Sequence, residues 1–249
     1  MVAESATLSY IARTSWNSDP IPMIDLVIFD CDGVLVDSEI IAARVEAALL
    51  TEAGFEISPE ELAETYAGLT FKDIMLRVEE VAGIPFQASM LDKAEALVDR
   101  RLAAEVRAIE GAREAVLSVQ EPRCVCSNSS LERLDMMLSA VNIKPLFGNN
   151  IFSSLATPSQ KPKPAPDVFL HAAREMGADA ARTFVIEDSV HGIRGAKAAG
   201  MRVIGFTGAA HSYPGHADAL TEAGAETVIR RWADLPGVLA ALAEWTEDA

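Results

Sequence analysis

The stretch LVIFDCDGVLVDSE, residues 26–39, decides the fold expected for this chain. Its first four residues are apolar, which is typical of a strand covered on both faces in a parallel sheet. Four carboxylates then follow within ten residues, namely Asp30, Asp32, Asp37 and Glu39. Negative charge gathered where a core strand ends indicates a functional site, although an Asp-Gly turn with solvated acids would fit this stretch alone.

The four acids fall into two pairs. Asp30 and Asp32 stand two positions apart, so an extended backbone points both side chains the same way. Two carboxylates so close stay ionised only if a cation lies between them or one takes a proton. Asp30 could then act as a nucleophile and Asp32 as a proton donor and acceptor. Asp37 and Glu39 are more typical of a helix start.

Composition limits the classes of protein to consider. The chain has 249 residues, half of them hydrophobic, and a formal net charge of −16, which is globular composition. An acidic surface repels phosphate backbones, so we expect no nucleic-acid partner, and we expect a soluble cytoplasmic protein that collects divalent cations. No apolar run reaches the ~18 residues of a membrane helix. Residues 1–22 show no secretion signal, and we expect a disordered extension there.

Strands and helices are predicted to alternate after residue 23, which favours a parallel sheet with helices on both faces. Apolar strand candidates are 24–30, 122–127, 182–187, 201–206 and 226–229. Helical segments are expected at 111–120, 129–141, 165–177, 189–199, 215–223 and 233–245. The fold class is therefore α/β, with a Rossmann-like core.

One stretch breaks the alternation. Residues 37–108 show no convincing strand and are expected to form four helices, near 38–53, 59–66, 70–82 and 87–108. We interpret this stretch as a small helical domain inserted into a core made of residues 23–36 and 109–249. In open α/β sheets ligands bind beyond the carboxyl ends of the strands, so the insert is placed to cover that site.

A second strand end carries small polar residues. In VCSNSS, residues 125–130, Ser127 or Asn128 could donate hydrogen bonds to an oxyanion. A helix N-cap is the ordinary alternative for these residue types. Ser129 or Ser130 is the more natural cap, which leaves Ser127 for a ligand.

Two further stretches add a lysine and a second acidic pair. KPKPAPDVF, residues 161–169, holds its lysines among prolines, and spacing alone does not decide between Lys161 and Lys163. Glu187 and Asp188 end the next apolar strand and could complete an oxygen-rich site for Mg²⁺. An N-cap role for Asp188 is the alternative. Taken in order, the strand ends supply an acid pair, a hydroxyl, a lysine and an acid pair.

These stretches resemble the haloacid dehalogenase superfamily, in its branch with a small helical cap after the first strand. The resemblance spans nearly the whole chain from Ile24 and rests on DxDGVLVDSE, S-N, KPxPDxF and EDSxxGxxxAxxAGM in the family's order. It implies Asp30 as the nucleophile that forms an aspartyl-phosphate and Asp32 as the general acid and base. It also implies Ser127, Asn128 and Lys163 at the phosphoryl group. The implied Mg²⁺ ligands are Asp30, Asp188, Glu187 and, through its backbone carbonyl, Asp32.

The resemblance leaves several activities to weigh. We expect a phosphatase that hydrolyses a small phosphorylated metabolite, a sugar phosphate or a sugar-acid phosphate of the phosphogluconate type. Sugar-phosphate mutases of the β-phosphoglucomutase type share the core motifs but usually carry a histidine where this chain has Ala42. Dehalogenases lack the second aspartate, and transport ATPases need membrane spans. Receiver domains are about half as long, and a silent binding protein would have lost a catalytic position.

Substrate choice is expected to depend on the helical insert. The candidate specificity residues are Glu39, Thr70, Phe71 and Lys72. We expect His191, His211 and His216 to have surface roles. The oligomeric state is expected to be a monomer or a small homo-oligomer.

Overall fold

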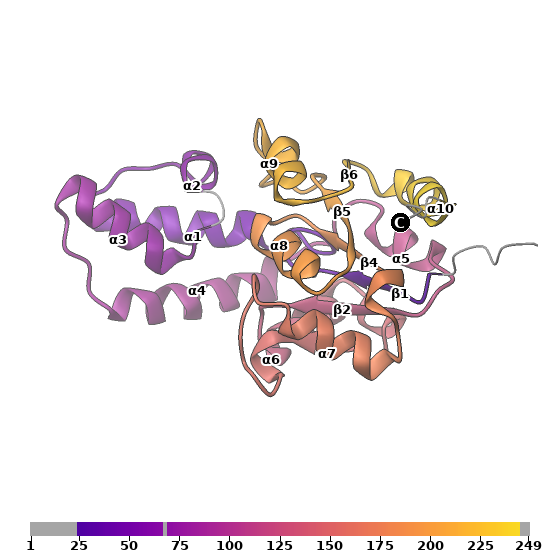
Figure 1. The fold of residues 1–249 in the computed structure, drawn as a ribbon. Helices are drawn as coiled ribbons and strands as arrows, with labels where there is room; N and C mark the ends of the chain where they lie inside the picture. Colours follow the sequence, from indigo (N-terminus) through magenta and orange to yellow (C-terminus); the bar gives the residue numbers. More distant parts are fainter. Residues whose placement is uncertain (1–23, 67–68, 245–249) are drawn as a thin grey trace, which may run out of the picture.

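Six parallel strands form one sheet at the centre of the protein (Figure 1). The computed structural model describes residues 24–66 and 69–244. The strand order is β3-β2-β1-β4-β5-β6, with β1 in the middle between β2 and β4. The strands are β1 (Leu26–Phe29), β2 (Arg123–Ser127), β3 (Ile151–Ser153), β4 (Thr183–Glu187), β5 (Arg202–Phe206) and β6 (Thr227–Ile229).

The central strand β1 is buried on both faces, as its uninterrupted apolar sequence predicts. Because side chains alternate along a strand, Val27 and Phe29 join one hydrophobic core, while Leu26 and Ile28 join the other. Its carboxyl end therefore opens in the middle of the sheet edge, where Asp30 follows.

Helices cover both faces of the sheet. One face packs against α5 (Ala112–Ser118), α6 (Leu131–Ala140) and α10 (Leu235–Glu244). The other packs against α7 (Asp167–Met176), α8 (Val190–Ala198) and α9 (His216–Ala223). Short 3₁₀ turns are found at Lys144–Leu146, Ser154–Ala156, Ala180–Arg182 and Trp232–Asp234.

Four helices between β1 and α5 form a block to one side of the sheet, at the left of Figure 1. This helical block has a small core of its own, centred on Leu50, Leu62 and Val78. Ser58 and Thr70 cap the second and third helices through their side-chain oxygens. The helices are α1 (Glu39–Glu52), α2 (Pro59–Thr65), α3 (Phe71–Ala82) and α4 (Ser89–Glu105).

The chain enters and leaves the helical block through two adjacent segments. The backbone N–H of Asp37 donates to the Arg107 carbonyl over 3.0 Å, and Ile109 N–H donates to the Leu35 carbonyl over 3.1 Å. Paired connections of this kind fix where the block joins the sheet, directly beyond the carboxyl end of β1.

The observed architecture confirms the predicted α/β fold class, with one strand more than expected. The additional strand β3 has only three residues, and Ile151 and Phe152 are half-buried, so it lacks a strong apolar signal. The expected extension at residues 1–22 lies outside the described residues. Within the described part of the chain, no helix has the length and apolar character needed to cross a membrane.

Candidate active site

A cavity of about 870 Å³ lies between the carboxyl edge of the sheet and the helical block. Strands β1, β2 and β4 are neighbours in the sheet, so their carboxyl ends bring Asp30, Ser127 and Glu187 together at its floor. Helices α1, α3 and α4 supply much of the opposite wall, including Glu39 and Ile74. The cavity is large enough for a small metabolite with its surrounding water.

Lys163 is the central cation of the cavity floor. Its Nζ donates to Asp30 Oδ1 over 2.6 Å, to Glu187 Oε1 over 2.7 Å and to the Cys126 carbonyl over 2.8 Å. Its backbone N–H donates to Asn128 Oδ1 over 2.8 Å, which fixes the loop that carries it. Of the two lysines left open by spacing, the structure therefore places Lys163 in the site, while Lys161 is exposed.

Asp30 is buried beside Lys163, and the pKa of both groups is shifted upward. Burial raises the pKa of Asp30 well above its usual range; Lys163 lowers it, and the nearby Glu187 and Asp188 raise it further. Burial would lower the pKa of Lys163, but Asp30 and Glu187 outweigh it and raise that pKa. The two shifts therefore differ in their main cause, which is burial for Asp30 and the neighbouring carboxylates for Lys163.

Asp30, Glu187 and Asp188 form a buried cluster whose ligand atoms lie within 4.8 Å of one another. Three acids so close suit a hard divalent cation such as Mg²⁺, which prefers oxygen ligands. Both Glu187 oxygens already accept hydrogen bonds, Oε1 from Lys163 and Oε2 from the hydroxyl and N–H of Ser189. Glu187 is thus better placed to hold Lys163 than to bind a metal directly.

Three serine hydroxyls hold Asp32. Its Oδ1 accepts from Ser38 over 2.7 Å, and its Oδ2 accepts from Ser127 over 3.1 Å and Ser129 over 2.8 Å. These contacts fix the carboxylate of Asp32, which is not part of the cluster that the other three acids form. Ser130 caps α6 by accepting from the Arg133 N–H, as the sequence suggested.

The two residues expected at a phosphoryl group both line the cavity. Ser127 Oγ accepts from the Ser129 N–H over 2.9 Å while it donates to Asp32. Asn128 uses its oxygen for the Lys163 N–H, so its amide NH₂ is the part left to meet a ligand. The Asn128 amide can donate hydrogen bonds toward an anion near Asp30, whereas the single hydroxyl hydrogen of Ser127 must first turn away from Asp32 to do so.

Two histidines expected on the surface belong to the site instead. The His211 Nε2 lies 3.0 Å from Asp188 Oδ2, and the buried His216 places Nε2 2.7 Å from the Asp188 carbonyl. Burial would lower the pKa of His211, but Asp188 outweighs it and raises that pKa to about 9. The surface expectation is therefore wrong for both, while His191 is exposed at the cavity rim.

Two glycines allow the acids to lie this close to the backbone. A Cβ at Gly33, whose φ is +71°, would lie 1.9 Å from Asp188 Oδ2. A Cβ at Gly192, in the first turn of α8, would lie 1.8 Å from Glu187 Oε1. A side chain at either position would displace a carboxylate of the cluster.

The candidate specificity residues separate into two groups. Glu39 and Thr70 line the cavity, whereas Phe71 and Lys72 do not. Phe71 packs against hydrophobic clusters, and Lys72 is exposed at the start of α3. Thr70 also caps α3, through the Asp73 N–H.

Sequence reasoning missed several residues that contact the site acids. Ser38 and Ser129 lie within the quoted motifs, but a serine beside a strand end is equally suited to a helix cap. His211 and His216 follow β5 in a loop with no local signal, and only the folded chain brings them to Asp188.

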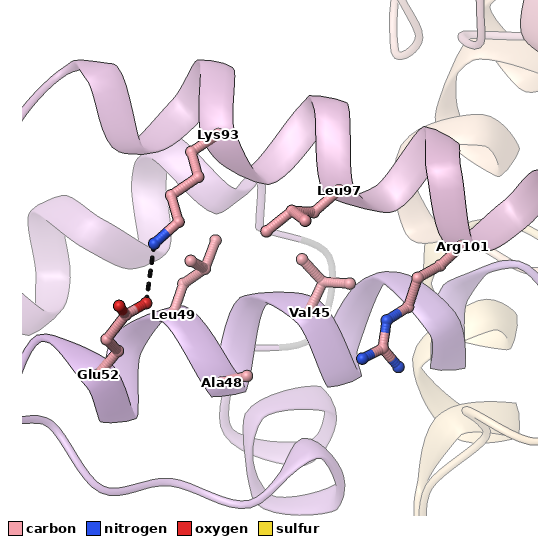
Figure 2. Close-up of a pocket in the computed structure, with 7 residues that line it drawn as sticks. All are labelled: Val45, Ala48, Leu49, Glu52, Lys93, Leu97 and Arg101. Carbon is pink, nitrogen blue, oxygen red and sulfur yellow. Dashed lines mark hydrogen bonds and ion pairs between the residues drawn. The ribbon is translucent and has the colours of Figure 1, made fainter.

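A smaller hollow of about 150 Å³ lies between α1 and α4, away from the strand ends (Figure 2). Val45, Leu49 and Leu97 form its apolar floor, and the ion pair between Lys93 and Glu52 spans one end. It contains no cluster of acids, so the larger cavity is the candidate active site.

The arrangement of the cavity floor defines its chemistry. A buried carboxylate beside a lysine can attack an electrophile, and a second carboxylate held by hydroxyls can move a proton. Among the three clustered acids and the two cations that touch them, Lys163 and His211, negative charge is in excess. An anionic substrate would increase that excess, so the residues fit a bound divalent cation.

Comparison with known proteins identifies the family. The model of the haloacid dehalogenase-like hydrolases matches residues 27–206. The 6-phosphogluconate phosphatase of Escherichia coli K12 is 32% identical over 194 residues, covering 77% of this chain and 86% of that protein. Hexitol phosphatase B of the same organism is 29% identical over 192 residues, covering 71% and 81%.

A solved structure with a similar fold belongs to the same family. A conserved haloacid dehalogenase-like protein of unknown function from Agrobacterium tumefaciens superposes with a TM-score of 0.86 at 60% identity, covering 89% of this chain and 100% of the other. The chain therefore belongs to the haloacid dehalogenase-like hydrolases and is an enzyme of that family. The family and fold predicted from the sequence are confirmed.

Proposed function

We propose that this protein is a Mg²⁺-dependent phosphatase that hydrolyses a small phosphorylated metabolite through an aspartyl-phosphate. One observation carries the proposal: Lys163 joins the buried Asp30 and Glu187 beside Asp188, at the floor of a cavity of metabolite size. Similarity to two enzymes named as phosphatases of sugar acids and hexitols supports it.

Asp30 is the proposed nucleophile. Its Oδ1 is taken by Lys163, and within the described residues its Oδ2 makes no hydrogen bond, so Oδ2 is the oxygen available to attack. The bond from Oδ2 to phosphorus forms as the bond from phosphorus to the leaving oxygen breaks. Lys163 neutralises the carboxylate and the phosphoryl oxygens, which lets two anions approach.

Asp32 is the proposed general acid and base. It donates a proton to the leaving oxygen in the first step. In the second it takes a proton from the water that attacks phosphorus, as the bond from phosphorus to Asp30 Oδ2 breaks and phosphate is released. Its contacts with Ser38 and Ser129 hold the carboxylate in place for both transfers. Ser127 and the amide of Asn128 are proposed to hold the phosphoryl oxygens.

The proposed cation site uses the buried acids of the cavity floor. The carboxylates of Asp30 and Asp188 and the backbone carbonyl of Asp32 would hold Mg²⁺, with Glu187 acting through its contact with Lys163. Bound Mg²⁺ would stabilise negative charge on the phosphoryl group during transfer. Asp188 is kept in place by His211 and, through its carbonyl, by His216.

The helical block is proposed to act as a cap over the cavity and to exclude bulk water from the reaction. We favour hydrolysis over a mutase because Ala42, on the cavity wall, stands where mutases of the β-phosphoglucomutase type usually carry a histidine, and its methyl group cannot carry a proton to a second substrate oxygen. Conversion of a sugar 1-phosphate to a 6-phosphate without release of phosphate would reverse that choice.

Hydrolysis of p-nitrophenyl phosphate with Mg²⁺ tests the proposal. We expect Asp30→Asn to lose at least about 10³-fold in kcat, because the nucleophile is removed. Lys163→Met is expected to lose at least about 10²-fold, and EDTA to abolish turnover reversibly.

Matched controls exist for both substitutions. Asp92→Asn, on the exposed face of α4, and Lys161→Met, two positions before Lys163, are expected to keep wild-type activity. Full activity of Asp30→Asn, or no turnover of any phosphate ester by the wild type, would overturn the proposal.

A further inference from the structure

One face of α1 lines the cavity, and its residues have a simple chemical pattern. Glu39, Ala42, Ala43 and Glu46 face the cavity, which is the spacing of one helical stripe. Two alanines therefore leave room at the middle of the stripe, and a carboxyl group stands at each end. The two glutamates are seven positions apart, which corresponds to about 10 Å along the helix axis.

Neither glutamate has a partner among the described residues. No hydrogen bond or ion pair joins Glu39 or Glu46 to another side chain, and Glu46 is half-buried. Asp73, also on the wall, is by contrast occupied in capping α3 with Thr70. Two carboxyl groups facing a cavity without partners have their acceptor oxygens free for a ligand.

Positive charge on the rest of the wall is already neutralised. Within the described part of the chain, the lysine and arginine that line the cavity are Lys163 and Arg133. Lys163 belongs to the floor, and the Arg133 guanidinium lies 2.7 Å from Asp99 and 3.9 Å from Glu95, both on α4. His211, the other cation of the cavity, is likewise paired, with Asp188. A carboxylate on the substrate would thus meet acids without a free cation to balance it.

We infer that Glu39 and Glu46 select a neutral polyhydroxylated leaving group, so that the substrate is a sugar or alditol phosphate and not a sugar-acid phosphate. The inference rests on the proposed phosphatase function and names its substrate class. Each carboxyl group accepts hydrogen bonds from substrate hydroxyls, while a second carboxylate on the substrate is repelled. A single amine could not reach both groups, whereas a chain of hydroxyls can.

The raised pKa of each glutamate makes the repulsion of a substrate carboxylate strongest above about pH 7. Burial raises the pKa of Glu46 to about 7. Burial also raises the pKa of Glu39 to about 7; Asp32 adds to that effect and His211 opposes it. Glu39 is exposed where it lines the cavity, so a ligand can reach its carboxyl group.

A matched pair of substrates tests the inference. D-Glucitol 6-phosphate and 6-phosphogluconate share a carbon chain and a phosphate position, and differ in a terminal CH₂OH against a carboxylate. At pH 8 we expect kcat/KM to favour glucitol 6-phosphate by at least about tenfold. Glu39→Gln and Glu46→Gln should each reduce that ratio at least about threefold, and Glu80→Gln, exposed on α3, should not change it.

Two results would overturn the inference. One is an equal or higher kcat/KM for 6-phosphogluconate; the other is a ratio unchanged in both α1 variants. Hydrolysis of p-nitrophenyl phosphate is measured in parallel, so that an active phosphatase with the wrong preference refutes only the substrate class. Loss of all turnover would refute the proposed function itself.

Discussion

At the scale of single residues, the position of Asp30 on the cavity floor has two conflicting requirements. The proposed role of Asp30 requires it to approach a phosphate closely, yet a buried carboxylate repels an anion. Lys163 offsets this repulsion with its positive charge, and three hydrogen bonds hold it in place, one of them to Asp30 itself. Because Lys163 also contacts Glu187, its ammonium is fixed and cannot swing away when a substrate leaves. Burial of a carboxylate without a cationic partner, as at Glu46, instead lowers the stability of the folded protein.

Glu46 predicts a specific pH dependence of stability. Its folded pKa of about 7 lies above the ordinary value of 4.5, so between these values the folded state holds a proton that the unfolded state releases. Stability from this group is present below about pH 4.5 and is lost as pH rises through about 7. Glu46→Gln removes the loss, so we expect it to be more stable than wild type at pH 8 by about 1 to 3 kcal/mol.

Urea unfolding at pH 5 and pH 8 measures that difference, because the advantage of Glu46→Gln should be larger at pH 8. Glu80→Gln is the control, since that exposed side chain should show no such change. An advantage that is equal at both pH values would contradict the account of Glu46.

At the scale of elements, the side chain at the end of β4 is held in position by the helix that follows it. The first turn of α8 packs against Glu187, and the absence of a side chain at Gly192 makes room for that carboxylate. Ser189 caps the same helix and donates to Glu187. The start of α8 thus positions Lys163 indirectly, by holding its acidic partner.

Gly192→Ala tests that role of α8. The added Cβ would lie 1.8 Å from Glu187 Oε1, so the carboxylate must move away from Lys163. We expect a loss of about 1 to 3 kcal/mol in the free energy of unfolding and at least about a tenfold loss in kcat. Chemical unfolding and p-nitrophenyl phosphate turnover measure the two effects.

Gly237→Ala is the matched control for that substitution. Gly237 is a helical glycine in α10 with open space around its Cβ position, so alanine should stabilise the protein by up to about 1 kcal/mol. Wild-type activity of Gly192→Ala would show that Glu187 does not position Lys163.

The sequence predicted elements better than contacts. Apolar runs ending in polar residues located β1, β2 and β4, because a buried strand and the site at its end leave signals close together in the chain. Strand β3 was missed, since three half-buried residues carry little periodicity. His211 and His216 were wrongly expected on the surface, because their approach to Asp188 depends on how the loop after β5 folds back.

At the scale of the molecule, the cavity lies between the helical block and the sheet, in a protein whose formal net charge is −16. Such a surface disfavours anionic metabolites at long range, so the cations at the floor must offset that repulsion locally. Arg133 links the two parts, since it lies on α6 and pairs with Asp99 on α4. The proposal of a cap over a phosphatase floor agrees with this arrangement, in which Lys163 lies at the floor and Arg133 joins the sheet side to the helical block.

The most direct test of the central claim is to trap the phosphorylated protein. Asp32→Asn should slow hydrolysis of the aspartyl-phosphate but not its formation from p-nitrophenyl phosphate, because p-nitrophenolate leaves without a proton. Acid quenching after reaction with radiolabelled p-nitrophenyl phosphate should leave label in the peptide that contains Asp30. Hydroxylamine should release it, and Asp30→Asn in the same background should prevent it. Label on Ser127, or a burst of phosphate without labelled protein, would contradict the account.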